Sequence, residues 1–120
     1  MNELSNVKIG FAMTGSFCTF EKAFLQAEKL KESGAELIPI MSYNASTISS
    51  RFGEAEENIR RLENICGRKI INTIDGAEPI GPKKMTDIMV VCPCTGNTCA
   101  KLASSITDSP VTMAVKSHIR

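Results

Sequence analysis

The chain has 120 residues, of which 42% are hydrophobic and 22% are charged, and its formal net charge is +1. A chain of this length can bury a core without a disulfide or a metal, so we expect one domain over residues 1–120. The balanced charge, without a basic arm or a charge block, argues against nucleic-acid binding. No apolar run is long enough to span a bilayer, which argues against a membrane protein.

The first residues lack a basic segment followed by a long apolar stretch, so the sequence predicts no secretion signal and a cytoplasmic location. Five cysteines in such a chain are most simply reduced thiols. Cys92, Cys94 and Cys99 lie close together, but they do not form the paired C-x-x-C motifs of zinc sites. We therefore predict no metal site. For Cys94, a small apolar role is favoured, and a reactive thiol beside a helix start is the alternative.

The first half of the chain alternates apolar and helical segments. The apolar run Val7–Met13, followed by Thr14-Gly15-Ser16, predicts a buried strand that ends in a turn. Apolar residues at helical spacing between Phe20 and Leu30 predict a helix, and Gly34 suits a left-handed cap after it. The apolar run Glu36–Met41 predicts a second strand, and the proline inside it indicates an edge position.

The middle of the chain is less regular. The Ser, Thr and Asn residues of 42–50 predict a loop, whereas Ala55–Cys66 has helical spacing and is followed by a glycine stop. Residues 69–74 are read as a short strand. The segment 76–84 contains two prolines and two glycines, so it is expected to be a loop.

The last third of the chain contains the apolar run Ile88–Cys92, which we read as its clearest buried strand. A short helix is predicted over Asn97–Ala103, and Asp108-Ser109-Pro110 is a typical helix start. The apolar face of this last helix is predicted to comprise Val111, Ala114, Val115, His118 and Ile119. The position of His118 on that face favours a packing role over a catalytic one.

Strands that alternate with helices imply parallel strands joined by helical crossovers. The expected fold class is therefore α/β, a Rossmann-like (flavodoxin-like) parallel sheet with helices on both faces. The chain stops at an amphipathic helix, where such a sheet would normally return with another strand. We therefore expect it to be a fragment of a longer protein that lacks its C-terminal part.

Ligands of open parallel sheets bind at the carboxyl ends of the strands, where this chain has three small polar segments. A glycine turn followed by a helix start can hold a phosphate, although a plain turn explains the first segment equally well. The segments fit neither G-x-G-x-x-G nor the P-loop pattern, so a dinucleotide site is not supported. The predicted cofactor-binding residues are Gly15, Ser16, Ser42, Thr95, Asn97 and Thr98.

The segment 92–103 (CPCTGNTCAKLA), followed by Asp108, resembles the P-x-T-x-N-x-x-A-K-x-A…D signature of the FMN-type flavoprotein superfamily. The Thr14-Gly15-Ser16 turn is similar to the first phosphate-loop segment of that superfamily. Within it, a closer resemblance is to the B subunits of bacterial dipicolinate synthases. The blocks that carry this closer resemblance are residues 9–21, 51–57, 77–83 and 95–111.

The resemblance implies a role in sporulation, in the mother cell of a spore-forming bacterium. In that branch, the B subunit acts with an NAD(P)-binding A-type subunit, and together they oxidise a dihydrodipicolinate-type precursor to dipicolinate. NAD(P) is thus expected on the partner, the substrate is a small dicarboxylate, and FMN is the cofactor that the superfamily implies. A homo-oligomer is also expected, since many members of the superfamily assemble.

One departure from the superfamily limits these expectations. The cysteine-decarboxylase branch has a catalytic histidine shortly before the strand that corresponds to Ile88–Cys92, and this chain has Pro79-Ile80-Gly81-Pro82 there. The difference argues against decarboxylation and leaves open whether FMN binds at all. Two alternatives therefore stay open, an FMN-binding flavoprotein and a non-catalytic assembly module of the same fold. The residues alone predict no catalytic group.

Overall fold

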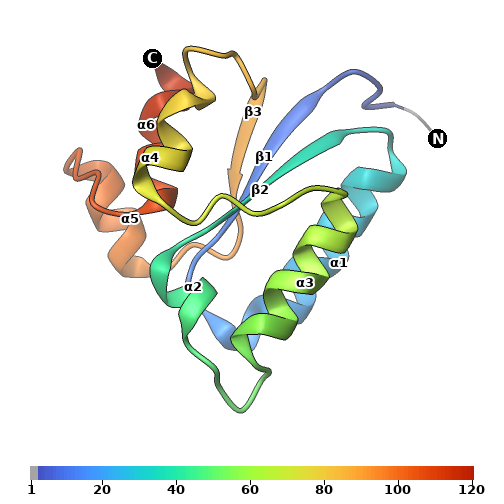
Figure 1. Ribbon diagram of the computed structural model, residues 1–120, viewed down its shortest axis with the longest axis vertical. Helices are drawn as coiled ribbons and strands as arrows, with labels where there is room; N and C mark the ends of the chain where they lie inside the picture. Colours follow the sequence, from blue (N-terminus) through green and yellow to red (C-terminus); the bar gives the residue numbers. More distant parts are fainter. Residues whose placement is uncertain (1–2) are drawn as a thin grey trace.

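The computed structural model of this protein describes residues 3–120, and its centre is a parallel sheet of three strands in the order β2-β1-β3 (Figure 1). Strand β1 (Lys8–Met13) pairs with β2 (Glu36–Met41) from end to end. On its other side, β1 pairs with β3 (Ile88–Val91). The three strands and their parallel pairing confirm the predicted Rossmann-like sheet.

Helices cover both faces of the sheet, as the alternation of segments predicts (Figure 1). The helices α1 (Phe20–Glu32) and α3 (Ala55–Cys66) lie side by side on one face. On the other face lie α4 (Ile74–Ala77) and α6 (Pro110–Ile119). Successive strand side chains point to opposite faces, so β1 and β2 each contribute to two cores. The first core includes Ile9, Phe11, Met13, Leu37 and Met41, and the second includes Ala12, Ile38 and Ile40.

Helix α6 begins at the predicted position. The Thr112 amide donates to the Ser109 hydroxyl at 3.2 Å, and the Ser109 amide donates to the Thr112 hydroxyl at 3.0 Å, which is a reciprocal capping box. The helix packs against the 3₁₀-helix η2 (Glu78–Ile80) and the glycine that follows it. A Cβ atom at Gly81 would lie 2.1 Å from the Ser117 carbonyl oxygen, so only glycine permits this approach.

Two segments predicted as loops contain short helices. The prediction for residues 42–50 is wrong at its start, because the Ser42 hydroxyl accepts an amide hydrogen bond at 3.1 Å and begins α2 (Tyr43–Thr47). The prediction for residues 76–84 is wrong in its first half, where Thr73 caps α4 and η2 follows directly. One polar cap can start a single helical turn, and such a turn is too short for a periodic pattern.

The strand predicted over residues 69–74 is reduced to one bridge beside β2. The Ile71 amide donates to the Pro39 carbonyl oxygen at 2.8 Å, and the Met41 amide donates to the Ile71 carbonyl oxygen at 3.0 Å. Pro39 has no amide hydrogen to donate, so this side of β2 supports little further pairing. The edge position expected from this proline is consistent with that geometry.

Strand β3 differs most from its prediction. It was expected to be the clearest buried strand, yet Ile88 is 45% exposed and the next three residues are only half-buried. Within residues 3–120, β3 pairs along only one of its edges, so an apolar run does not guarantee burial. The predicted apolar face of α6 is also wrong at Ile119, which is 74% exposed, whereas Ser117 is buried.

Candidate functional site

The carboxyl ends of the three strands meet at one edge of the sheet, where α2 and the beginnings of α1 and α5 (Gly96–Ala103) gather (Figure 1). Two backbone hydrogen bonds join these ends. The Ser42 amide donates to the Met13 carbonyl oxygen at 3.0 Å, and the Thr14 amide donates to the Pro93 carbonyl oxygen at 3.1 Å. The strand-end loops, as we call them, are residues 14–16, 42–44 and 93–98.

Thr14 is the most deeply buried residue of these loops, with 1% of its surface exposed. Its hydroxyl donates to the Pro93 carbonyl oxygen at 2.7 Å and accepts from the Thr95 amide at 2.9 Å. The side chain therefore joins the end of β1 to the segment that follows β3. The site prediction did not include Thr14, because no local pattern reveals a bond across 81 residues of sequence.

Gly15 and Ser16 form the predicted turn after β1. A Cβ atom at Gly15 would lie 3.2 Å from Cβ of Asn44, so the turn packs tightly against the start of α2. The Ser16 hydroxyl accepts from the Thr19 hydroxyl at 3.2 Å at the start of the 3₁₀-helix η1 (Phe17–Thr19). Its own proton can still be donated to a ligand, which suits an anion.

Ser42 lies at the end of β2 and is only 9% exposed. Its hydroxyl accepts from the Ala45 amide at 3.1 Å, and its carbonyl oxygen accepts from the Ser46 hydroxyl at 3.0 Å. The structure thus brings Ser42 to the predicted edge, where its observed hydrogen bonds cap α2.

Thr95 and Thr98 have a similar structural role at the start of α5. The Thr98 amide donates to the Thr95 hydroxyl at 3.1 Å, and that hydroxyl donates to the Thr98 hydroxyl at 2.9 Å. The Cys99 amide bonds to the Thr95 carbonyl oxygen at 2.9 Å. These contacts show that the predicted ligand-binding hydroxyls of α5 also form its cap.

The first two residues of α5 have the donors best placed for an anion. The amides of Gly96 and Asn97 lie in the first helical turn, where the helix itself supplies no acceptor. Space around Gly96 is open, since a Cβ atom there would meet nothing within 4 Å, and the Asn97 side chain is exposed. Two amides and one carboxamide can thus reach a ligand at this edge, with the positive end of the helix dipole behind them.

Over residues 1–120, the sequence matches the protein family described as Flavoprotein. The chain belongs to the flavoprotein family. It is 46% identical over 120 residues to the B subunit of dipicolinate synthase from Bacillus subtilis strain 168, covering 100% of this flavoprotein chain and 60% of that protein. The chain therefore spans less than two thirds of this curated relative.

Several solved structures resemble this flavoprotein. The dipicolinate synthase B subunit from Bacillus halodurans superposes with a TM-score of 0.84 at 39% identity, over 100% of this chain and 61% of that one. The FMN-dependent cysteine decarboxylase SpaF superposes with a TM-score of 0.76 at 20% identity, over 95% of this chain and 64% of that one. At such low identity, the second likeness shows the fold alone.

In this flavoprotein, the signature residues that carry the resemblance have structural partners. The Pro93 carbonyl oxygen accepts from Thr14, and Thr95 caps α5. Lys101 Nζ lies 3.0 Å from both carboxylate oxygens of Asp108, which joins the end of α5 to the approach to α6. These contacts join signature residues of the segment 93–108 to the end of β1 and to one another.

Titratable groups near the strand-end loops of the flavoprotein offer little acid–base chemistry. His118, its only histidine, lies at the amino end of β3, where its Nδ1 is 2.7 Å from the Thr86 hydroxyl. Cys94 is exposed, but partial desolvation raises the pKa of its thiol, and the neighbouring Cys99 thiol adds to the rise. A raised pKa lowers the thiolate fraction, which disfavours the reactive-thiol alternative.

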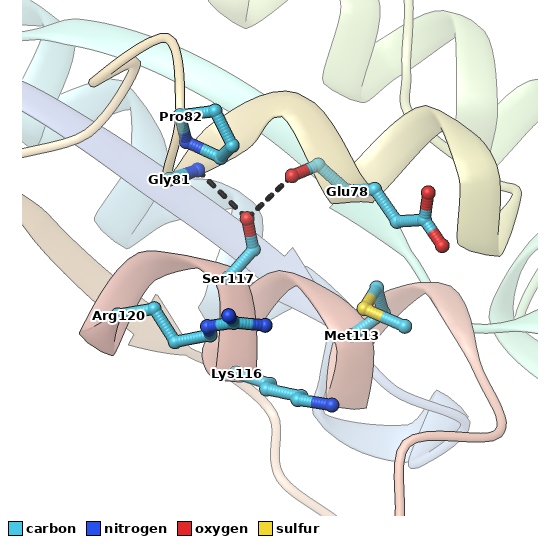
Figure 2. Close-up of a pocket in the computed structure, with 7 residues that line it drawn as sticks. All are labelled: Glu78, Gly81, Pro82, Met113, Lys116, Ser117 and Arg120. Carbon is cyan, nitrogen blue, oxygen red and sulfur yellow. Dashed lines mark hydrogen bonds between the residues drawn. The ribbon is translucent and has the colours of Figure 1, made fainter.

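Two cavities of the flavoprotein lie away from the predicted residues. A cavity of about 500 Å³ opens between η2 and α6, and Figure 2 shows Ser117 joining its walls. The Ser117 hydroxyl accepts from the Gly81 amide and donates to the Glu78 carbonyl oxygen, both at 2.7 Å. A second cavity, of about 210 Å³, lies between α5 and α6. Neither contains a predicted cofactor-binding residue.

Two further questions about the described residues concern membrane-spanning helices and groups of metal-binding side chains. Across residues 3–120, no helix is both long and apolar enough to cross a membrane. In the same residues, His, Cys, Asp and Glu side chains form no group of three or more that could hold a metal ion.

Proposed function

We propose that this flavoprotein chain works as part of a dipicolinate synthase B subunit, together with an NAD(P)-binding A-type subunit. The observation that carries the proposal is the 46% identity to the B subunit of Bacillus subtilis dipicolinate synthase along all 120 residues. The strand-end loops support it, because they bring Gly15, Ser16, Ser42, Thr95, Asn97 and Thr98 to one edge of the sheet.

The proposed reaction converts a dihydropyridine dicarboxylate into the aromatic pyridine dicarboxylate. The ring loses one hydride, which passes to NAD(P)⁺ on the A-type subunit, and one proton, which is released to solvent. This division of labour fits a B chain that lacks a G-x-G-x-x-G segment. The role of this chain is then to bind and orient an anionic group.

The strand-end loops fit an anionic group on the donors they present. The amides of Gly96 and Asn97 and the hydroxyl of Ser16 can each donate, and the space above Gly96 is open. The anion is either the phosphate of FMN or a carboxylate of the substrate. When bound, FMN would supply a two-electron acceptor. The residues of this chain would hold its phosphate.

A reconstituted assay tests the proposed activity. The complete protein that contains this chain is mixed with the A-type subunit, NADP⁺ and the dihydrodipicolinate-type precursor, and the ultraviolet absorbance of pyridine dicarboxylate is followed. The proposal expects product formation to depend on the B protein. An equal rate without the B protein would refute it.

A non-catalytic assembly module is the second candidate. The observation that favours it is the structural use of the Ser42, Thr95 and Thr98 hydroxyls, together with a histidine far from the strand-end loops. Ser16→Ala and Asn97→Ala separate the two candidates. Unchanged turnover with intact A–B assembly favours the module, and lost turnover with intact assembly favours the ligand site.

The location and the assembly state complete the proposal. We place the protein in the cytoplasm of the mother cell of a spore-forming bacterium, as a homo-oligomer that also binds the A-type subunit. Sedimentation of the complete protein, alone and with the A-type subunit, measures both associations. A single monomeric species under both conditions would contradict them.

A further inference from the structure

The Thr14 side chain has an unusual position for a residue in a ligand-binding turn, because it is buried and both of its hydrogen-bonding functions are used inside the protein. Its hydroxyl proton is given to the Pro93 carbonyl oxygen, and its lone pair receives the Thr95 amide. No donor remains for a ligand. Thr14 must therefore influence the edge of the sheet through the residues that it holds.

The residue held by Thr14 is the N-cap of α5. Thr95 sets the first turn of that helix, since the amides of Thr98 and Cys99 both bond to it. The two free amides of the turn belong to Gly96 and Asn97, the next residues along the chain. A shift of the Thr95 backbone would therefore move both donors relative to the Gly15 turn.

The two outer strand ends differ in what holds them against β1. Beside the end of β2, Ala45 and Ser46 are buried, so packing supports that loop. Beside the end of β3, Cys92 and Pro93 are only half-buried and Gly96 and Asn97 are exposed. Of residues 93–98, only Thr98 is buried, so packing is limited there and directional hydrogen bonds help to set the position of α5.

We propose that Thr14 is a positioning residue, whose hydroxyl fixes the amino end of α5 at the distance from the Gly15 turn that an anionic ligand requires. The part that concerns the ligand rests on the proposed function. The part that concerns the Thr95 amide does not depend on it. The two parts can therefore be tested separately.

Three variants of the complete protein test the proposal. Thr14→Val keeps the shape and removes the hydroxyl, whereas Thr14→Ser keeps the hydroxyl. Thr86→Val is the matched control, because it removes a 2.7 Å hydroxyl hydrogen bond to His118 at the amino end of β3. Hydrogen exchange of the Thr95 amide is measured by NMR, and the Kd values of FMN and of pyridine-2,6-dicarboxylate are measured by titration.

Thr14→Val should lower the exchange protection of the Thr95 amide about tenfold, the loss expected for one such hydrogen bond. The Kd of whichever probe binds the wild type should rise about tenfold. Thr14→Ser should restore both values to within about twofold, and Thr86→Val should change neither.

Several results would overturn the positioning role. Unchanged Thr95 protection in Thr14→Val refutes the contact itself. Lost protection with an unchanged Kd would show that the Thr14 contact does not affect ligand binding. An equal rise of Kd in Thr86→Val would show that the effect of Thr14→Val is general destabilisation. If the wild type binds neither probe, the proposed anion site fails, while the exchange measurement still decides whether Thr14 positions α5.

Discussion

The two strands that flank β1 present opposite environments at the same sheet. In β2, every residue from Leu37 to Met41 is buried, with α1 and α3 on one face and α6 on the other. In β3, no residue is buried, although it pairs with β1 in the same parallel sense. The comparison separates strand formation, which backbone pairing provides, from burial, which depends on what covers the strand.

The difference also divides the predicted ligand site. The loop after β2 is supported by a packed core, whereas the loop after β3 is joined to β1 through Thr14. We therefore expect the β2 side to govern the stability of this domain and the β3 side to govern the geometry of the site. Four predictions test that division.

The largest loss of stability is expected from the truncation of a core side chain in β2. Leu37 is fully buried, and Val90 of β3 packs against the same core while only half-buried. Leu37→Ala should lower the free energy of unfolding by about 2–5 kcal/mol, because it leaves a cavity. Val90→Ala should cost about 1 kcal/mol, since less of its side chain is withdrawn from water. Urea unfolding of both variants measures the difference.

The comparison of the two strands would fail if both truncations cost the same. An equal cost would mean that other parts of the protein cover β3 as completely as α1, α3 and α6 cover β2. The m-values of the two variants serve as the control, because they should remain equal if the unfolded states are alike.

The next effect concerns the layer that covers the second face of the sheet. A Cβ atom at Gly81 would lie 2.1 Å from the Ser117 carbonyl oxygen, so Gly81→Ala should force η2 away from α6. We expect a loss of about 1–3 kcal/mol, the usual cost of overpacking. Gly96→Ala is the matched control, because nothing lies within 4 Å of the added atom and its φ is not positive. It should stabilise α5 by up to about 1 kcal/mol. Similar melting temperatures for the two variants would contradict the close contact.

The sequence predicts the long elements of this fold well, because their patterns are local. The helix Ala55–Cys66 has the predicted bounds, and the capping residues before α6 were recognised. The errors occur where structure depends on distant partners. The burial of β3 depends on neighbouring strands, and α2 forms through one Ser42 cap in a segment without helical periodicity.

The candidate site was predictable only in part for the same reason. The rule that ligands lie at the carboxyl ends of parallel strands located Gly15, Ser42 and Thr95 at a common edge. Thr14 was missed, since its partners are 79 and 81 residues away along the chain. The roles of the predicted residues as ligand contacts remain a prediction.

A smaller effect is expected from the different burial of two cysteines, Cys66 at the end of α3 and Cys92 directly after β3. Burial in the first core raises the pKa of Cys66 from 9.0 to about 12, and burial also raises that of the half-buried Cys92. A raised folded-state pKa contributes stability below the unfolded value, and this contribution is lost as the pH rises from about 9 towards 12. At pH 10, the wild type should have lost about 1 kcal/mol relative to pH 8 through Cys66.

Cys66→Ala and Cys92→Ala test this assignment by the slope of stability against pH. The slope between pH 8 and 10, a range of about two units, should flatten more in Cys66→Ala than in Cys92→Ala. Differences in slope are compared, so the cavity that each variant creates does not matter. A slope in Cys66→Ala as steep as that of the wild type would show that Cys66 is hydrated in the folded protein.

The smallest effect is expected at the ion pair between α5 and the segment before α6. Lys101 and Asp108 are joined at 3.0 Å, but their side chains are 28% and 57% exposed, so solvent screens the attraction. Lys101→Met should cost about 0.5 kcal/mol at low salt, and the loss should shrink in about 1 M NaCl. Asp108→Asn should have the same effect, and the double variant should show no additional loss from the pair. If Lys101→Met cost as much as Leu37→Ala, exposed polar contacts, and not only the buried Thr14 hydroxyl, would hold the segment after β3 in place.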